Sequence, residues 1–417
     1  MSEMKDLVEE GVISAIVDNV LQEKKHKLRA GKKLMVCFFV SQKQFWSMQS
    51  IYDTLKKYNC FQLFVVPFPA SYHISEERKE TYRELCAFHK ANGAHVLHVC
   101  DEENNLLIPP EELSPDIIFY EQHWMGNFHP EYQIANMFKS ALCICIPYGV
   151  MIANIPEDQF NGVAHNLAWL NFVETPMHLR LSRKYADNKG INSVASGYPK
   201  FDAYAAPVKK HYWKSNSPHI KRIIWAPHYS VNTLSVINFG TFFTYAQKLL
   251  DLARSNTNHI EFIIKPHPAL KSQCAKLGLP TQIFDDYINT WDSLPNASVV
   301  TDGDYLDLFK TSDAIILDSL SFISEYMITG KPMCFLSKYP TFEMLATHFN
   351  EYGIRALSLI DIAYNQDDLI RFIQKVCLDR IPPNTARDSF VDAMLKINFG
   401  HVGEFIVEYI FNKLSAK

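Results

Sequence analysis

A histidine and a serine follow one of the apolar runs in the second half of the chain. The run ends at Ala226, and the sequence continues as Pro227-His228-Tyr229-Ser230. Because a proline stiffens the backbone, we expect His228 and Ser230 to be held in fixed positions at the end of a strand. An imidazole at this point is either a ligand-binding group or a satisfied structural histidine, and the residues alone leave both interpretations open.

A second histidine lies between two prolines, again directly after an apolar run. Ile260–Ile264 is followed by Lys265-Pro-His267-Pro. The prolines restrict the backbone around His267, which favours a positioned imidazole over a mobile surface side chain. Together with the ammonium group of Lys265, this imidazole suits a negatively charged phosphate. The alternative is a rigid turn in which the charge is incidental.

A third polar segment joins an apolar run to a predicted helix. Asp318, Ser319 and Ser321 end the run Ala-Ile-Ile-Leu, and Glu325 follows along the helix. The N-terminus of such a helix offers free N–H groups and a positive dipole end to an anion, and the serine hydroxyls add donors. We expect Asp318 to organise the turn and Glu325 to reach ribose hydroxyls. An ordinary N-cap with an exposed Glu325 is the alternative.

The elements that position these residues follow from the alternation of short apolar runs with longer amphipathic segments. The strands expected in the first half are 34–40, 61–66, 96–99, 117–120 and 142–146, with a helix over 76–92. Those expected in the second half are 222–226, 260–264, 297–300, 314–317 and 333–336, with helices over 241–254, 306–310 and 323–328. Continuous apolar strands separated by helices predict parallel sheets covered on both faces.

This pattern predicts an α/β protein of the GT-B architecture, with two doubly wound Rossmann-like domains facing a cleft and a helical tail. Prolines and polar residues break the periodicity between about 203 and 220. We therefore expect an acceptor-side domain over 1–205, a nucleotide-donor domain over 206–384 and a C-terminal helical tail over 385–417. Ligands bind at the carboxyl ends of strands in such sheets, so the three polar segments predict a donor site in the second domain.

Composition and motifs exclude several classes of protein. Hydrophobic residues make up 47% of the chain and charged residues 21%, which predicts a packed globular protein. A formal charge of −4 argues against a nucleic-acid-binding protein. Neither G-x-G-x-x-G nor G-x-x-x-x-G-K-[ST] occurs, which argues against nicotinamide and P-loop enzymes. The nine cysteines lack the spacing of a zinc site, so no metal site is expected.

The N-terminal region bears on where the protein acts. Residues 1–6 are polar and do not form a signal-peptide core, and no run approaches the roughly 20 apolar residues of a membrane span. We therefore expect a cytoplasmic protein. One basic cluster at the end of the first predicted helix is either a solvated helix end or a peripheral contact with anionic lipid on the inner face of the membrane. It comprises Lys24, Lys25, Lys27, Arg29, Lys32 and Lys33.

Four motifs in a fixed order carry a resemblance to a known family. They are Gly197-Tyr-Pro-Lys-Phe-Asp202, Trp225-Ala-Pro-His-Tyr-Ser230, Lys265-Pro-His-Pro268 and Asp313-Ala-Ile-Ile-Leu-Asp-Ser-Leu-Ser-Phe-Ile-Ser-Glu325, with Lys331-Pro332 following. On these motifs the chain resembles the CDP-glycerol glycerophosphotransferase family, which includes teichoic-acid polymerases and primases and their capsule-polymer relatives. The resemblance covers residues 190–340 well and the N-terminal half poorly.

The sequence departs from the family pattern at two places. The D-Y-S-S segment of the family is Asp-Ser-Leu-Ser here, so Asp318 and Ser321 carry over directly and Ser319 replaces the aromatic residue. The family's W-H-G tripeptide, whose histidine is thought to act as base, is absent. Tyr148, in Pro-Tyr-Gly, and His123, in His-Trp, are the two candidates for its place.

The resemblance implies a donor such as CDP-glycerol or CDP-ribitol and a polymer or lipid-linked acceptor. An acceptor hydroxyl would attack the phosphorus next to the polyol and expel CMP. We expect His267, Ser321 and the helix N-terminus to bind the diphosphate, with His228 assisting the leaving phosphate. The other expected donor-binding residues are Lys265, Asp318, Ser319, Glu325 and Ser230. His123, Glu121 or Tyr148 would accept the proton. No cofactor is required by this scheme, and a loosely held Mg²⁺ on the diphosphate stays open.

Two other functions fit the same residues. The first is a GT-B glycosyltransferase that uses a UDP- or CMP-sugar in capsule or lipopolysaccharide synthesis. The second is a non-catalytic GT-B-like subunit of an assembly complex, which the absence of the W-H-G histidine favours. Aromatic residues in polar surroundings, Trp124 and Trp213, are candidates for stacking on an acceptor, with simple packing as the alternative.

Overall fold

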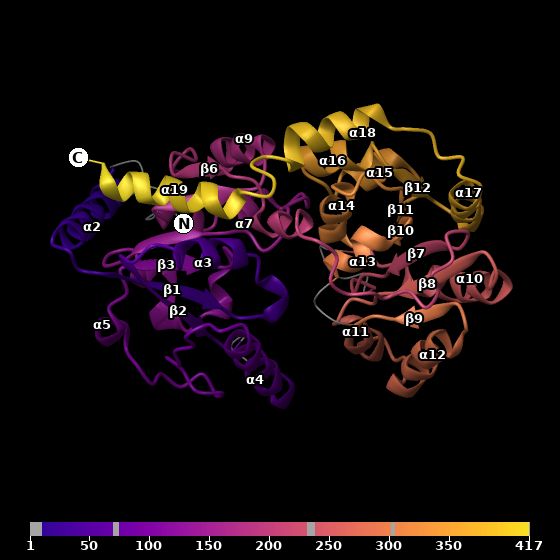
Figure 1. The fold of residues 1–417 in the computed structure, drawn as a ribbon, viewed down its shortest axis with the longest axis horizontal. Helices are drawn as coiled ribbons and strands as arrows, with labels where there is room; N and C mark the ends of the chain where they lie inside the picture. The colour runs from indigo at the N-terminus through magenta and orange to yellow at the C-terminus, as the bar shows by residue number, and fades with distance from the viewer. Residues whose placement is uncertain (1–10, 70–74, 232–237, 302–304, 417) are drawn as a thin grey trace. The chain divides into compact units, whose positions relative to one another are not determined.

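The computed structural model describes residues 11–69, 75–231, 238–301 and 305–416, and the chain forms two compact units (Figure 1). Unit 1 comprises residues 1–151, 155–205 and 394–417, and unit 2 comprises residues 152–154 and 206–393. Residues 385–417, set apart above as a helical tail, divide between the two units.

Within its described residues, unit 1 is built on a six-stranded parallel sheet with the order β2-β1-β3-β4-β5-β6. The strands are β1 Leu34–Val40, β2 Phe61–Pro67, β3 Ile117–Tyr120, β4 Leu142–Cys145, β5 Leu170–Val173 and β6 Ser193–Ala195. The helices are α2 Val12–Arg29, α3 Gln49–Leu55, α4 Glu76–Ala91, α5 Pro110–Leu113, α6 Ile134–Met137, α7 Pro156–Phe160, α8 Val163–Leu167, α9 Pro176–Tyr185 and α19 Val402–Ser415. Short 3₁₀ turns are η1 Lys43–Phe45, η2 Met125–Asn127, η3 Pro130–Tyr132 and η4 Pro199–Tyr204.

The described part of unit 2 repeats this plan with a six-stranded parallel sheet in the order β12-β11-β10-β7-β8-β9. The strands are β7 Lys221–Ala226, β8 Ile260–Ile264, β9 Ala297–Val299, β10 Ala314–Leu317, β11 Met333–Leu336 and β12 Asp361–Ala363. The helices are α10 Phe242–Ser255, α11 Leu270–Lys276, α12 Thr281–Ser293, α13 Leu306–Thr311, α14 Leu320–Met327, α15 Phe342–Ala346, α16 Glu351–Leu357, α17 Gln366–Cys377 and α18 Thr385–Phe390. A π-helical turn, η5 Val391–Leu395, follows α18.

The strands are apolar throughout because each sheet is buried on both faces. In β1, Val36 and Phe38 belong to one hydrophobic cluster, and the alternate residues Cys37 and Phe39 belong to another. Successive side chains of a strand point to opposite faces, so the two clusters lie on the two sides of the sheet. Burying one such phenylalanine contributes about 1.5–3 kcal/mol. This burial explains the continuous apolar runs that predicted parallel sheets.

The motif Gly197–Asp202 has a structural role inside unit 1. The carboxylate of Asp202 accepts the backbone N–H groups of Val402 and Gly403 at 2.9 and 2.8 Å, so it holds the start of α19. Gly197 has φ +89°, and a Cβ atom there would lie 2.3 Å from the carbonyl oxygen of Ile397. The motif therefore attaches the C-terminal helix, which lies against α3 in Figure 1.

The predicted elements differ from the observed ones in a few places. The strand expected over 96–99 is reduced to a single bridge between Val96 and Val65. The strands β5, β6 and β12 were not predicted. The helix expected over 323–328 begins three residues earlier, at Leu320. The other strands lie within one residue of the expected positions, so the alternation of runs predicted the order of elements well.

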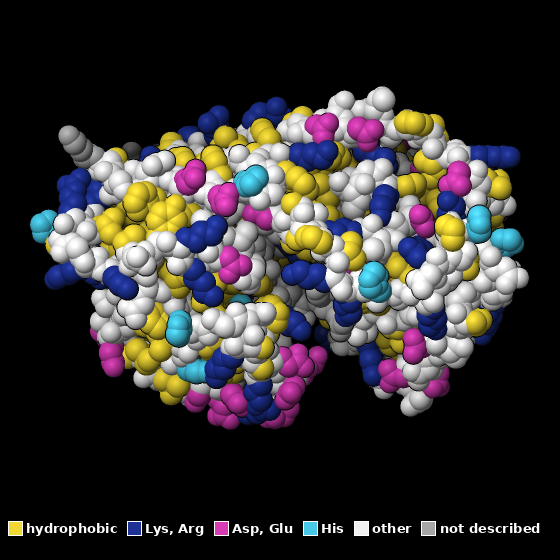
Figure 2. All heavy atoms as spheres, in the orientation of Figure 1, with side chains coloured by type: hydrophobic (Ala, Val, Ile, Leu, Met, Phe, Trp, Pro, Cys, Tyr) yellow, Lys and Arg dark blue, Asp and Glu magenta, His cyan; other side chains and the backbone are white. Residues whose placement is uncertain are grey.

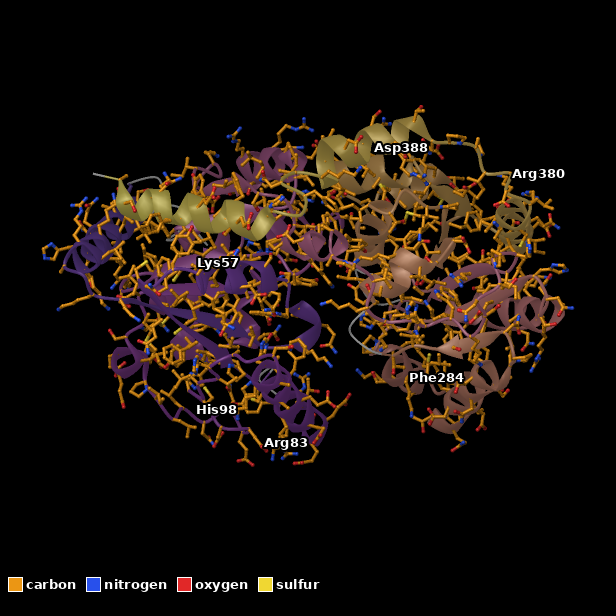
Figure 3. All side chains as sticks on the ribbon, viewed as in Figure 1. Lys57, Arg83, His98, Phe284, Arg380 and Asp388 are labelled. Atoms are coloured by element: carbon orange, nitrogen blue, oxygen red, sulfur yellow. The ribbon has the colours of Figure 1, made fainter. Side chains whose placement is uncertain are left out.

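The surface of unit 1 around α4 carries charges of both signs. Figure 2 shows acidic and basic side chains intermixed at this end of unit 1. Arg83, which Figure 3 labels on α4, pairs with Glu80 and Glu102. Such exposed pairs contribute little to stability and indicate a solvated face. Among the described residues, no helix is long and apolar enough to cross a membrane.

Candidate functional site

The three polar segments of unit 2 follow neighbouring strands. β10, β7 and β8 are adjacent in the sheet, so the segments after Leu317, Ala226 and Ile264 meet at one carboxyl edge. The chain runs outward from β7 through β8 to β9 and then returns to place β10 on the other side of β7. This reversal is a topological switch point, where open α/β sheets bind ligands. The structure thus brings the predicted donor-site segments together.

The buried carboxylate of Asp318 joins two loops at this switch point. Its side chain is fully buried, and one carboxylate oxygen accepts the backbone N–H of His228 at 2.5 Å. The other oxygen accepts the backbone N–H and the hydroxyl of Thr241, which precedes α10. Burial raises the pKa of Asp318 to about 6, although these hydrogen bonds act to lower it. Because both oxygens accept bonds from other loops, Asp318 positions the loop of His228 and the start of α10, whereas the sequence predicted that it organises its own turn.

Hydrogen bonds fix the ring of His228. Its Nδ1 lies 2.7 Å from the Ser230 hydroxyl and 3.3 Å from the Ser230 backbone nitrogen. That hydroxyl already accepts the backbone N–H groups of Phe239 and Gly240, so it donates to the ring. A backbone N–H can only donate, so Nδ1 is the acceptor and the neutral ring carries its proton on Nε2. Ser230 is buried, and its hydroxyl orients His228 instead of lying open to the donor as expected.

The ring of His267 is also fixed by a hydrogen bond to its Nδ1 atom. Its Nδ1 accepts the backbone N–H of Ala269 at 3.1 Å, so the proton of the neutral ring is again on Nε2. The backbone N–H of His267 donates to the carbonyl of Pro227, which ties the end of β8 to the end of β7. The ring centroids of His228 and His267 are 5.3 Å apart, and the ring of Tyr229 lies beside both.

Both imidazoles are neutral donors at neutral pH. Burial lowers the pKa of His228 to about 3, with a further contribution from His267. Burial also lowers the pKa of His267 to about 4, and the charge of Lys265 adds to this effect. Neutral rings with Nε2–H groups donate hydrogen bonds to an anion without the cost of a buried charge. Two such donors side by side suit the oxygens of a diphosphate.

Lys265, Tyr305 and Glu325 form a second group beside the histidines. The Lys265 ammonium lies 5.2 Å from the ring centroid of Tyr305, and the Tyr305 hydroxyl donates to the Glu325 carboxylate. Lys265 and Glu325 are 6% and 2% exposed, so the alternative of an exposed Glu325 is excluded. A cation over an aromatic ring is attracted by the electron-rich face of the ring. The group therefore places the Lys265 ammonium and the Glu325 carboxylate on either side of Tyr305 at the carboxyl edge.

The helix α14 begins at this edge. Ser319 is its N-cap, and among the described residues no side chain caps the helix. The first N–H groups and the positive dipole end are thus available to an anion. Ser319 is buried and Ser321 is half-buried. This arrangement is the one expected for a phosphate site and differs from the side-chain N-cap given as its alternative.

Unit 1 has a buried carboxylate at its own switch point. The order β2-β1-β3 places the reversal between β1 and β3. One oxygen of Glu121, after β3, accepts from the backbone and hydroxyl of Ser41 and from the backbone of Gln42, after β1. The other oxygen is buried without a hydrogen-bond partner among the described residues. Burial raises the pKa of Glu121 to about 8, despite the bonds from Ser41 and Gln42.

His123 lies near this point and stacks on His165. The two ring centroids are 4.0 Å apart and the rings are within 5° of parallel. Burial lowers the pKa of His123 to about 4 and also lowers the pKa of His165. Nε2 of His123 and both ring nitrogens of His165 are buried without hydrogen-bond partners among the described residues. Both rings are therefore neutral at neutral pH.

Tyr148 follows β4 at the same edge of unit 1. Its ring centroid lies 4.3 Å from that of Phe45 and 5.4 Å from that of Trp124. The Tyr198 hydroxyl donates to the Tyr148 carbonyl, which links Tyr148 to the Gly197 motif. Trp213, the other aromatic candidate, donates from its indole N–H to Thr311 in unit 2. Its contacts are those of a packed residue.

Sequence reasoning missed several residues of these groups. Tyr229 lay within a quoted motif but was given no role. Thr241, Tyr305 and His165 are distant in sequence from their partners, and no local pattern pointed to them. The basic cluster presents less exposed positive charge than its sequence suggests, because Lys24 and Lys25 are buried and the Lys27 ammonium pairs with Asp116.

A cavity of about 430 Å³ lies elsewhere in unit 1. It is lined by residues of α2, of α19 and of the starts of β5 and β6, and includes Asn188, Ile191 and Tyr409. The starts of parallel strands lie at the amino edge of a sheet, opposite the edge of Glu121. The cavity is therefore separate from the candidate site. Among the described residues, no group of three His, Cys, Asp or Glu side chains is arranged to hold a metal ion.

Solved structures with the same fold are similar to the chain over nearly its whole length. The wall teichoic acid polymerase TagF has a TM-score of 0.57 at 12% identity, covering 99% of this chain and 98% of that chain. A UDP-GlcNAc 2-epimerase from Neisseria meningitidis has a TM-score of 0.56 at 14% identity, covering 91% and 100%. A putative UDP-N-acetylglucosamine 2-epimerase from Listeria monocytogenes has a TM-score of 0.54 at 15% identity, covering 92% and 98%. At these identities the likeness shows the fold alone, and it confirms the GT-B prediction.

Sequence comparison gives the family. No curated protein sequence matches the chain. The model of the family described as CDP-glycerol:poly(glycerophosphate) glycerophosphotransferase matches residues 181–412, which is more than half of the chain and includes all of the donor-site residues in unit 2. The resemblance read from the four motifs is confirmed, and the chain belongs to this family and is a transferase of polyol phosphate groups from a CDP-activated donor.

Proposed function

We propose that unit 2 binds the diphosphate of CDP-glycerol at the carboxyl edge of its sheet, and that the chain transfers the glycerol phosphate group to an acceptor hydroxyl. The observation that carries this proposal is the pair of Nε2–H donors on His228 and His267, 5.3 Å apart between ring centroids. The start of α14 with Ser321, and the ammonium of Lys265, add donors and positive charge at the same edge. Together they complement a diphosphate.

The proposed reaction is an in-line displacement at the phosphorus next to the glycerol. The acceptor oxygen forms a bond to this phosphorus while the bond to the bridging oxygen of the diphosphate breaks. The bridging oxygen leaves with the electron pair as part of CMP, and the acceptor proton passes to a base. Such transfers depend on positioning and charge stabilisation more than on covalent catalysis.

The two histidines have different parts in this scheme. His267, next to Lys265, holds the diphosphate. His228 is fixed by Ser230 and Asp318 and donates to the phosphate of the leaving CMP, on which negative charge develops. A bound anion favours the charged form of a nearby imidazole, so the pKa of His228 rises when the donor binds. The ring then stabilises the leaving group more strongly than it stabilises the ground state.

His123 is the residue that we assign as proton acceptor in unit 1. Its ring is neutral at neutral pH, and its Nε2 atom is buried without a hydrogen-bond partner among the described residues. Glu121 is fully buried and serves to hold the switch-point loops. A pKa of about 4 makes His123 a weak base. This suffices where the transition state is loose and the proton leaves late. Tyr148, the other candidate for the place of the family's histidine, offers an aromatic surface.

A cell-envelope polymer is the acceptor that the comparisons support. The matched family is named for poly(glycerophosphate), and TagF is a wall teichoic acid polymerase. The proposal includes a cytoplasmic location with peripheral contact to anionic lipid through the exposed Lys32 and Lys33. Sedimentation with vesicles of phosphatidylglycerol and phosphatidylcholine tests this contact. Binding that is lost in K32E/K33E supports it, and equal binding by that variant contradicts it.

The role of a metal ion is a separate point of the proposal. We propose that any Mg²⁺ is carried by the donor diphosphate, so that the protein residues named above need no metal to bind cytidine nucleotides. Titration with CMP in the presence of a chelator tests this. Unchanged CMP affinity supports the proposal, and loss of binding contradicts it.

The direct test is product analysis with several donors. The purified chain is incubated with CDP-glycerol, CDP-ribitol and UDP-sugars, and released CMP or UDP is measured together with the mass of the acceptor. CMP release with transfer of glycerol phosphate supports the proposal. UDP release from a sugar donor, without CMP release from any CDP-polyol, contradicts it.

A further inference from the structure

The cavity of about 430 Å³ at the amino edge of the unit 1 sheet is separate from both candidate sites. The helices α2 and α19, which lie side by side in Figure 1, form two of its walls. Residues 187–192, between α9 and β6, form a third wall. The buried apolar residues that line it are Ile13, Ala168, Trp169 and Leu170. The described part of the chain leaves this volume open.

The loop over residues 187–192 is held in one conformation. The Asn166 side-chain oxygen accepts the backbone N–H of Asn188 at 2.9 Å, and the Asn188 side-chain oxygen accepts the backbone N–H of Gly190 at 2.8 Å. Lys189 and Gly190 have φ of +56° and +60°, a left-handed conformation that a lysine rarely adopts. Ile191 follows directly. The loop therefore presents Ile191 from a fixed backbone, so that little conformational entropy is lost when a partner covers it.

Ile191 is the most exposed of the large apolar side chains in the described residues. Its exposed fraction is 75%, and the next highest value is 56%, for Leu378. A single exposed apolar side chain is common on protein surfaces. Ile191 differs because it lines an open cavity whose inner residues are apolar. An exposed apolar side chain beside such a cavity is typical of a surface that another molecule covers.

Charged side chains of both signs also line the cavity. They are Asp18, Asp187, Lys189 and Lys413, and we call these four residues the rim. Within the described ranges, Asp18, Asp187 and Lys189 form no ion pair, and the Lys413 ammonium lies over the ring of Tyr409. A partner whose charges all have one sign would be repelled by half of the rim. A second copy of the same surface carries both signs and is therefore complementary to it.

We propose that two copies of this chain associate through this surface about a two-fold axis, with Ile191 of each copy inserted into the cavity of the other. In a two-fold interface each contact occurs twice, so the acidic rim residues of one copy face the basic rim residues of the other. Burial of the two isoleucines supplies affinity, and the rim charges set the orientation. The surface lies at the amino edge of the unit 1 sheet, so the carboxyl edge of that sheet stays free.

Sedimentation velocity of the full-length protein tests this association. We expect a shift from monomer to dimer as the concentration rises between about 1 and 100 µM. Ile191→Glu should raise the dimer Kd about tenfold or more, because a charge replaces the inserted apolar side chain. Ile283→Glu is the matched control. Ile283 on α12 of unit 2 is 52% exposed, and its substitution should leave the Kd unchanged.

A charge reversal on α2 tests the complementarity of the rim. Asp18→Lys places like charges across the axis and should also raise the Kd, whereas Glu23→Lys makes the same change of charge on α2 at a residue that does not line the cavity. We expect Glu23→Lys to dimerise normally.

Three results would overturn the proposal. The first is a monomer at every concentration, or a dimer that Ile191→Glu leaves intact. The second is a species that grows beyond the dimer, which a closed two-fold interface does not form. The third is a monomer that binds vesicles of phosphatidylglycerol and phosphatidylcholine and loses this binding in Ile191→Glu, which would assign the surface to a lipid bilayer.

Discussion

The Asp318 carboxylate accepts the backbone N–H of His228 at 2.5 Å, so the ends of β10 and β7 are joined at the switch point of unit 2. Unit 1 is built in the same way, with the Glu121 carboxylate on the backbone and hydroxyl of Ser41 at 2.5 and 2.6 Å. In each unit a fully buried carboxylate holds the loop of the first strand. Of the side chains that we assign to chemistry, His228 lies in the loop that Asp318 holds, and His123 lies two residues after Glu121.

Asp318→Asn tests the positioning role of this carboxylate. An amide presents a single acceptor oxygen, and its N–H₂ group would meet the N–H of either His228 or Thr241. We expect the free energy of unfolding to fall by about 1–3 kcal/mol, the cost of buried hydrogen bonds to a charged group, and transfer to fall with it. Urea denaturation measures the first effect. Asp251→Asn on the exposed face of α10 is the control, and equal stability of the two variants contradicts the account.

His267→Ala tests the donor site. Loss of one hydrogen bond to a charged phosphate is worth about 1.5–3 kcal/mol, so we expect kcat/KM for CDP-glycerol to fall by roughly 10- to 150-fold. The control is His219→Ala, because His219 is an exposed histidine of the same unit. Steady-state CMP release measures both variants. An equally small fall in kcat/KM in both variants would contradict the account.

The buried histidines predict a loss of stability in acid. Burial lowers the pKa values of His123, His228 and His267 from 6.5 to between about 3 and 4. Below pH 6.5 the unfolded chain binds protons that the folded chain does not, so the free energy of unfolding falls as the pH falls toward 4. The limiting slope is about 1.4 kcal/mol per pH unit for each histidine. Denaturation curves at pH 7, 6 and 5 measure it, and equal stability at these pH values contradicts it.

Glu121 predicts the opposite slope between its unfolded pKa of 4.5 and its folded pKa of about 8. Its pKa in the folded chain is about 8, raised from 4.5, so the folded chain keeps a proton that the unfolded chain has lost. Stability from this group falls as the pH rises from 4.5 to 8, by up to about 1.4 kcal/mol per pH unit. Glu121→Gln keeps an acceptor oxygen for Ser41 and removes the titration. We expect its stability to fall less than that of the unsubstituted protein between pH 6.5 and 8.5, and identical slopes refute the assignment.

Two glycines with the same φ separate steric contact from backbone strain. Gly197 and Gly278 both have φ +89°, but a Cβ atom would lie 2.3 Å from the Ile397 carbonyl oxygen only at Gly197, and in open space at Gly278. Gly278→Ala should cost about 1–2 kcal/mol for the left-handed backbone alone. Gly197→Ala should lower the free energy of unfolding by clearly more than Gly278→Ala does, and it should weaken the attachment of α19. Thermal unfolding measures both, and equal costs contradict the role of the motif.

The order of elements could be predicted because the strands are apolar on both faces. The strand β8 was predicted at its observed bounds, since Ile260–Ile264 is an uninterrupted apolar run apart from Glu261. The strand β5 was missed because Asn171 interrupts it, and its side chain bonds the carbonyl of His165. β12 is short and half-exposed and begins with Asp361. Local pattern therefore identifies strands that form apolar runs, including β2 and β9 at the sheet edges, and misses the shorter or more polar strands β5, β6 and β12.

The donor residues could be predicted because they follow strands within short motifs. The interactions among these residues could not be predicted. The proton positions on His228 and His267 depend on backbone N–H groups of the folded turns. The raised pKa of Glu121 comes from burial, which no sequence pattern records. The His123–His165 stack joins β3 to α8 across the fold.

The central claim is that the chain moves glycerol phosphate from CDP-glycerol through the donor site of unit 2. The most direct measurement is simultaneous quantification of CMP and of the acceptor product by mass spectrometry, for the unsubstituted protein and for His267→Ala. We predict one CMP for each glycerol phosphate added to the acceptor, with both falling together in the variant. CMP release that is unaffected by His267→Ala, or product formation without CMP, would contradict the account.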